Sequence, residues 1–111
     1  MIFNTTGKTT LISQENSAFP QFVQKIKTAY TQFQETNIII NLFSFDMLTA
    51  NDLLEFLELS NTHRGAKKSF VLVTDKVAID DIPEEISVAP TLQEANDIIE
   101  MEEIERDLDL F

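Results

Sequence analysis

The stretch NIIINLFSFDMLTANDLLEF, residues 37–56, combines two patterns that together indicate an α/β fold. Residues 37–42 contain an unbroken apolar run, whereas a strand with one face in water would alternate apolar and polar side chains. We therefore expect a central parallel strand that is covered on both faces. After Thr49 the apolar residues recur at helical spacing, so a helix is expected to follow this strand directly.

The same two patterns recur along the rest of the chain. Strand signals are found at residues 2–3 and 9–13, which flank a glycine turn, at 70–73, and in a shorter form at 86–88. Amphipathic helices are expected over residues 19–33, over 50–64 and from Thr91 onward, the last with Leu92, Ala95, Ile98, Ile99 and Met101 on its apolar face. Alternation of strands and helices predicts a mixed, mostly parallel β-sheet with helices packed on it.

The length of 111 residues suits one domain with one core. We expect a single domain over residues 1–111, with residues 102–111 as an acidic C-terminal extension. The chain has no cysteine, which excludes disulfides, thiolate metal sites and a cysteine nucleophile. The N-terminal residues lack the pattern of a signal peptide, and no apolar run reaches the roughly 18 residues of a membrane helix. These features predict a soluble, cytoplasmic protein.

Negative charge is concentrated in the last third of the chain. Residues 1–74 carry six acids and six bases, whereas residues 75–111 carry thirteen acids and two bases, which accounts for the net charge of −11. Such a chain repels phosphate backbones and anionic lipids, so we expect neither nucleic-acid nor membrane binding. A protein partner with a basic or mixed surface is the better expectation.

The order of elements and several local segments resemble the STAS domain family, the small α/β domain of anti-sigma factor antagonists and of sulfate transporter tails. The matching segments are residues 37–42, 45–49, 70–74 and 91–95. The resemblance implies a bacterial, non-catalytic regulatory module that binds a protein, with an anti-sigma factor that is also a kinase as the kind of partner. In that family a serine after the central strand is phosphorylated.

Here Asp46 matches the acid of the family's phosphorylation turn, but Met47 and Leu48 replace the serines, which makes the turn degenerate. Thr49 is the nearest hydroxyl that follows. Thr49 and Asp52 also form a capping-box pattern, in which each side chain bonds the other's backbone N–H at a helix start. Asp46, Thr49 and Asp52 are therefore candidates for partner binding or phosphorylation, with a capped helix start as the alternative.

Catalysis has little support in the sequence. Asp46 and Asp52 alone lack a nucleophile and an activating base, and the single histidine, His63, lies beside Arg64 near a helix end. We expect His63 to complement the negative end of the helix dipole, and Gly65 to take the left-handed position that ends the helix. The sequence predicts no enzyme, no cofactor and no metal site.

The C-terminal segment EMEEIERDLDLF, residues 100–111, places apolar residues among acids. It either forms a solvated helix end, with Ile104 and Leu108 against the first helix, or it docks into a basic groove through Leu108, Leu110 and Phe111. A non-phosphorylated scaffold or dimerisation module of the same fold is the alternative function, so a homodimer also stays open. An unrecognised enzyme is the third and least supported reading.

Overall fold

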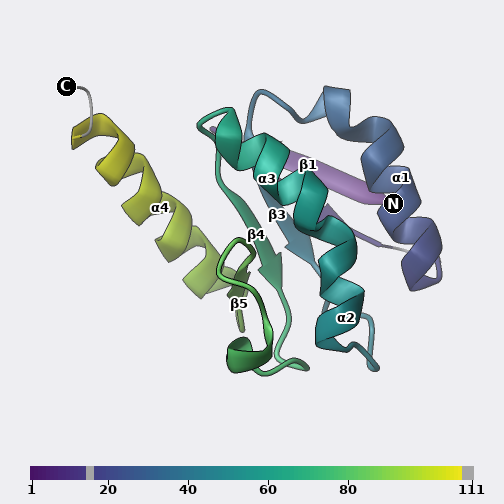
Figure 1. Ribbon diagram of the computed structural model, residues 1–111. Coiled ribbons are helices and arrows are strands. Elements are labelled where there is room, and N and C mark those ends of the chain that lie inside the picture. The colour runs from purple at the N-terminus through teal and green to yellow at the C-terminus, as the bar shows by residue number, and fades with distance from the viewer. Residues whose placement is uncertain (15–16, 109–111) are drawn as a thin grey trace.

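The computed structural model describes residues 1–14 and 17–108, and these form an α/β domain with one five-stranded mixed sheet (Figure 1). The strands are β1 (Ile2–Thr6), β2 (Thr9–Ser13), β3 (Asn37–Asn41), β4 (Phe70–Val73) and β5 (Ser87–Ala89). The α-helices are α1 (Phe19–Ala29), α2 (Ala50–Leu53), α3 (Leu57–Gly65) and α4 (Leu92–Leu108). Three short 3₁₀ helices, η1 (Tyr30–Gln32), η2 (Leu54–Phe56) and η3 (Ile79–Asp81), complete the described elements.

The strands lie in the order in which they occur along the chain, β1-β2-β3-β4-β5. The pair β1 and β2 is antiparallel, and every later pair is parallel. Ile38 lies opposite Phe70 in the parallel pair of β3 and β4, so the prediction of a central parallel strand at residues 37–42 is confirmed. The hairpin is tighter than expected, because Thr6 pairs with Thr9 and only two residues form the turn. Gly7 takes the positive φ of 60° that such a turn requires.

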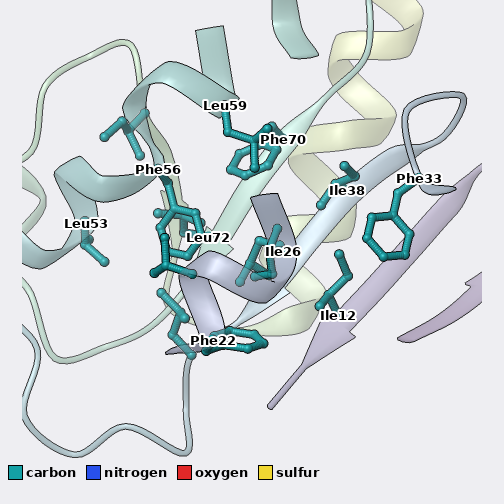
Figure 2. Close-up of a cluster of buried hydrophobic side chains, with 14 of the residues drawn as sticks. Ile12, Phe22, Ile26, Phe33, Ile38, Leu53, Phe56, Leu59, Phe70 and Leu72 are labelled. Carbon is teal, nitrogen blue, oxygen red and sulfur yellow. The ribbon is translucent and has the colours of Figure 1, made fainter. Parts of the chain in front are cut away.

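Helices cover both faces of the sheet, which explains the unbroken apolar runs. On one face, α1, α2, η2 and α3 pack over strand residues that alternate along the chain, such as Ile38 and Ile40 (Figure 2). On the other face, α4 packs over the intervening residues, such as Ile39 and Val71. A strand that is covered on both sides cannot carry polar residues at alternate positions without burying them.

The helix predicted over residues 50–64 is divided by the 3₁₀ turn η2. Leu53, Phe56 and Leu59 are all buried and follow one another at steps of three residues. Side chains three apart diverge on an α-helix but line up on a 3₁₀ helix, which has three residues per turn. The local tightening at η2 therefore brings Leu53 and Phe56 to the same core.

The end of α3 differs from the expectation for Gly65. Gly65 is still helical, and the left-handed residue is Lys67, with φ of 68°. The N–H of Lys67 donates to the carbonyl of Arg64 at 3.0 Å and the N–H of Lys68 to that of His63 at 3.3 Å. These two bonds are those of a Schellman motif, with a lysine at the position that usually holds glycine.

Lys67→Gly is therefore expected to raise the free energy of unfolding by about 0.5–1 kcal/mol. An L-residue in the left-handed region costs the folded state about 1–2 kcal/mol, which glycine avoids. The greater conformational freedom of glycine in the unfolded chain offsets part of this gain. Urea denaturation measures the change. Lys68→Gly serves as the control, since Lys68 has no positive φ and its replacement should destabilise the domain. A loss of stability in both variants would contradict the strain assigned to Lys67.

His63 does not complement the helix dipole as expected. Its side chain is fully buried, with Nε2 2.7 Å from the carbonyl oxygen of Thr36 and Nδ1 2.7 Å from the Tyr30 hydroxyl. The carbonyl can only accept, so Nε2 carries the proton and the Tyr30 hydroxyl donates to Nδ1. Burial lowers the pKa of His63 and raises that of Tyr30, which keeps both groups neutral. His63 thus links α3 to the segment that precedes β3.

Candidate functional site

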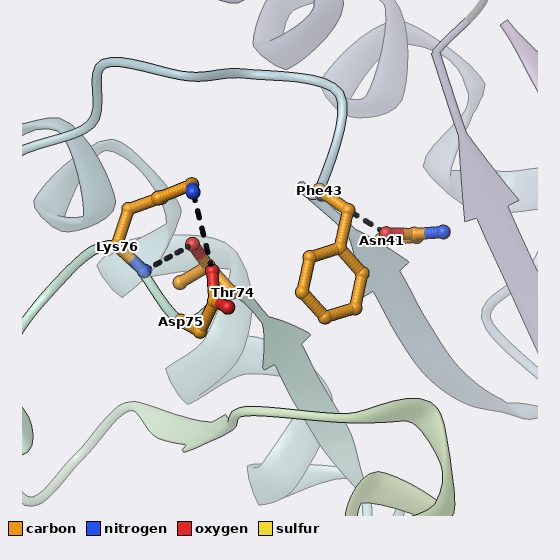
Figure 3. Close-up of polar contacts among 5 residues, drawn as sticks. All are labelled: Asn41, Phe43, Thr74, Asp75 and Lys76. Carbon is orange, nitrogen blue, oxygen red and sulfur yellow. Dashed lines mark hydrogen bonds and ion pairs between the residues drawn. The ribbon is translucent and has the colours of Figure 1, made fainter.

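The loops that follow β3 and β4 lie side by side at the carboxyl edge of the parallel strands (Figure 3). The N–H of Leu42 donates to the carbonyl of Val73 at 2.9 Å, which continues the strand pairing to the start of both loops. Asn41 Oδ1 then accepts from the N–H of Phe43 at 3.0 Å and turns the first loop away from the sheet. Phe43 is 38% exposed as a result.

The loop after β4 is turned by a similar local bond. Thr74 is buried, and its Oγ1 accepts from the N–H of Lys76 at 3.2 Å. Lys76 Nζ lies 3.7 Å from a carboxylate oxygen of Asp75, and both side chains are exposed. This loop therefore presents one cation and one anion beside the loop that follows β3.

A partly buried side chain, Phe45, and a buried one, Leu48, hold the loop after β3 and leave the residues between them in solvent. Phe45 packs against Phe19 and Phe22 of α1, with ring centroids 5.3 and 5.7 Å apart, and Leu48 is buried in the same core. Met47, between these anchors, is 91% exposed. A flexible apolar side chain on a fixed loop is a surface that can adapt to a protein partner.

Thr49 and Asp52 form the predicted capping box at the start of α2. The N–H of Asp52 donates to Thr49 Oγ1 at 3.2 Å, and the N–H of Thr49 donates to Asp52 Oδ2 at 3.0 Å. The capping interpretation is confirmed. Asp46 is exposed in the same loop, but within the described residues it makes no hydrogen bond or ion pair with Thr49 or Asp52. The structure thus brings together two of the three candidates and leaves the third beside Met47.

Thr49→Ala is expected to lower the free energy of unfolding by about 1 kcal/mol, because it removes the acceptor for the N–H of Asp52 at the helix start. Equilibrium unfolding in urea measures this change. Thr49→Ser keeps a hydroxyl and should retain most of the stability. If the two variants unfolded at the same denaturant concentration as the wild type, the hydroxyl would have no capping role.

The candidate docking tail lies elsewhere on the molecule. Leu108 is the last residue of α4 and is exposed, while Leu110 and Phe111 lie outside the described residues. Arg106, one half-turn earlier, reaches Ser69 at the amino edge of the sheet. Leu108 and the loop at Asp46 are therefore near opposite edges. Ile104 and Leu108 do not touch α1, which covers the other face.

Sequence reasoning did not identify Phe43 and Met47 as exposed apolar residues at this edge of the sheet. In the sequence Met47 stands out only as the replacement for a family serine, because sequence spacing cannot show which of Phe45, Met47 and Leu48 is buried. A partial signal exists, since an apolar residue directly after Asp46 in a short loop is a candidate for exposure. Met101 also differs from the sequence expectation, because it is 61% exposed and does not lie on the core face of the last helix.

Within residues 1–14 and 17–108, no three His, Asp or Glu side chains gather in a group that could hold a metal ion. None of the helices in this part of the chain has the length and apolar character needed to cross a membrane. The sequence matches no protein-family model and no curated protein.

Proposed function

We propose that this domain is a non-catalytic regulatory module that binds a protein partner through the carboxyl edge of its sheet, in the manner of an anti-sigma factor antagonist. The binding surface consists of Phe43, Asp46, Met47, Thr49 and Asp52, here called the edge surface. The observation that carries the proposal is the 91% exposure of Met47 on a loop held by the partly buried Phe45 and the buried Leu48.

The arrangement of charge and apolar area on the edge surface supports a protein partner. Phe43 and Met47 are apolar and exposed, and Asp46 is exposed next to them. Interfaces between proteins commonly combine a small apolar centre, enriched in aromatic residues and methionine, with a polar rim. An acidic rim favours a partner with basic residues around an apolar pocket.

The topology of the sheet favours binding at a surface over binding in a crevice. In open α/β sheets, small ligands bind where the strand order reverses and neighbouring loops part to opposite faces. The five described strands follow one another without reversal, so this sheet has no such point among them. The crossovers through α1 and through α2 to α3 both lie on the same face.

The non-phosphorylated scaffold is the second candidate, and the capping box favours it. Thr49 Oγ1 already accepts a backbone bond, and the Asp52 carboxylate lies at the N–H of Thr49. Phosphate at Thr49 would bring about two negative charges next to that carboxylate, which opposes the capped geometry. Mass spectrometry of the protein from its native cells decides between the two, since a switched module carries phosphate at Thr49 under some growth condition.

Met47→Glu is expected to weaken binding of the protein that co-purifies with the tagged chain by about tenfold, because it places a charge at the centre of the proposed interface. Gln32→Glu is the matched control. Gln32 is exposed on η1, away from the edge surface. Its replacement by Glu adds the same charge there, so binding should be retained. Quantitative pull-down at several bait concentrations measures both. Equal loss or equal retention in the two variants would rule out the edge surface as the binding site.

A further inference from the structure

The outer face of α4 carries an apolar stripe that belongs to neither hydrophobic cluster of the described residues. Met101, Ile104 and Leu108 are 61%, 54% and 64% exposed. Their spacing of three and four residues places them on one line along the helix. The residues that pack on the sheet, Ala95 and Ile99, lie on the opposite side. We call Met101, Ile104 and Leu108 the outer stripe.

Acidic side chains border the outer stripe on both sides. The exposed acids of α4 are Glu94, Asp97, Glu100, Glu105 and Asp107. The helix as a whole has seven acids and one base, a net charge of −6. Within the described residues the only ion pair is Lys76 with Asp75, so none of the acids of α4 forms a direct ion pair with a base of the domain.

Buried polar contacts hold the C-terminal half of α4 in a fixed rotation. Ser69 and Asn37 are both buried at the amino edge of the sheet. The Ser69 hydroxyl donates to Glu102 at 2.5 Å and accepts from Arg106 at 3.2 Å, while Asn37 Nδ2 donates to Glu103 at 3.4 Å. These contacts, made by Glu102, Glu103 and Arg106 within about one turn of the helix, fix which face meets the sheet. The outer stripe is therefore presented to solvent by an ordered helix.

We propose that the outer stripe is the docking face for a basic amphipathic helix of a partner protein. Two helices pair along a seam of apolar residues spaced three and four apart, and flanking charges select the partner. A second copy of this chain would bring a helix of charge −6 against another in either orientation. A helix with leucine or isoleucine on one face and lysine or arginine beside them offers both the apolar seam and the opposite charge. This site is independent of the edge surface, from which it is separated by the sheet.

The test uses the full chain and a labelled synthetic peptide of leucine and lysine in a heptad pattern. Fluorescence anisotropy should show that the peptide binds the wild type about tenfold more tightly than a peptide of the same composition with scattered leucines. The triple variant Met101→Gln, Ile104→Gln, Leu108→Gln keeps every charge and should lose about tenfold in affinity. Ile79→Gln removes an exposed apolar residue from η3 and should bind as the wild type does.

Three results would overturn the proposal. Equal binding of the scattered peptide would reduce the interaction to charge alone. Full binding by the triple variant would remove the outer stripe from the site. A wild-type dimer in sedimentation equilibrium that the triple variant converts to a monomer would assign the stripe to a second copy. Circular dichroism of the triple variant checks the fold, and the single variant Ile104→Gln, with an intermediate loss, provides a second measurement.

Discussion

Phe56→Ala is expected to lower the free energy of unfolding by about 4 kcal/mol, which is the range for removing a fully buried aromatic ring from a core. Phe56 is fully buried in η2, and its ring lies 6.0 Å from that of Phe19 and 6.2 Å from that of Phe70. It thus joins α1, η2 and β4. Its removal leaves a cavity between a helix, a turn and the sheet, so the site cannot easily collapse.

Urea denaturation monitored by circular dichroism measures the loss. Leu54→Ala is the control in the same 3₁₀ turn, because Leu54 is partly exposed and its truncation should cost about 1 kcal/mol or less. Similar losses in the two variants would mean that η2 does not present Phe56 to the core as the structure places it. A loss below about 2 kcal/mol for Phe56→Ala would lead to the same conclusion.

His63→Leu is expected to cost about 2–3 kcal/mol at pH 7.5, because it leaves the Thr36 carbonyl and the Tyr30 hydroxyl without their partner. Leucine is similar in size, so the loss reports the hydrogen bonds more than a cavity. Tyr30→Phe removes only one of the two bonds and should cost about 1 kcal/mol. An unchanged stability of His63→Leu would contradict the role of His63 as a buried link.

The same histidine predicts how stability changes with pH. Burial lowers the pKa of His63 below its ordinary 6.5, and the charge of Lys68 acts in the same direction, while the bond to Thr36 opposes it. As the pH falls below 6.5, the unfolded chain takes up a proton that the folded chain does not, so the folded state loses stability until its own pKa is reached. His63 is the only histidine. Between pH 7.5 and 5.5 the wild type should therefore lose more stability than His63→Leu, and parallel curves would contradict a buried neutral imidazole.

The sheet could be predicted from the sequence because its signal is local and repeated. The apolar runs at residues 37–42 and 70–73 have no alternation, and only a strand with cover on both faces explains them. The capping box could also be predicted from the sequence, because Thr49 and Asp52 lie three residues apart and their hydrogen bonds involve no other part of the chain.

The features that could not be predicted depend on tertiary contacts. Gly65 has the residue type of a left-handed position, but the contacts of α3 extend the helix past it and place Lys67 there. His63 has the position of a helix-end cation, but its face of α3 turns toward Tyr30 and Thr36. In both cases residue type alone favours a solvent-exposed helix end, and packing decides otherwise.

The exposure of the apolar residues in the two proposed surfaces also could not be predicted from the sequence alone. Met101 continues the apolar spacing of α4 from Ile98, yet the sheet is covered by the side of the helix that carries Ala95 and Ile99. Met47 differs from Leu48 by one position, and only the packing of Leu48 into the core reveals that Met47 remains outside. The exposure of these two apolar residues is therefore information that the structure adds to the sequence.

Site-specific photo-crosslinking at position 47 tests most directly whether the edge surface binds a protein. A photo-reactive amino acid replaces Met47 in the full chain, and in a matched sample it replaces Gln32, which is also exposed but lies outside the edge surface. After irradiation in the native cells, we expect one discrete crosslinked protein from position 47 and none from position 32. Crosslinks of equal pattern from both positions, or a discrete crosslink from position 32 alone, would contradict the proposed binding surface.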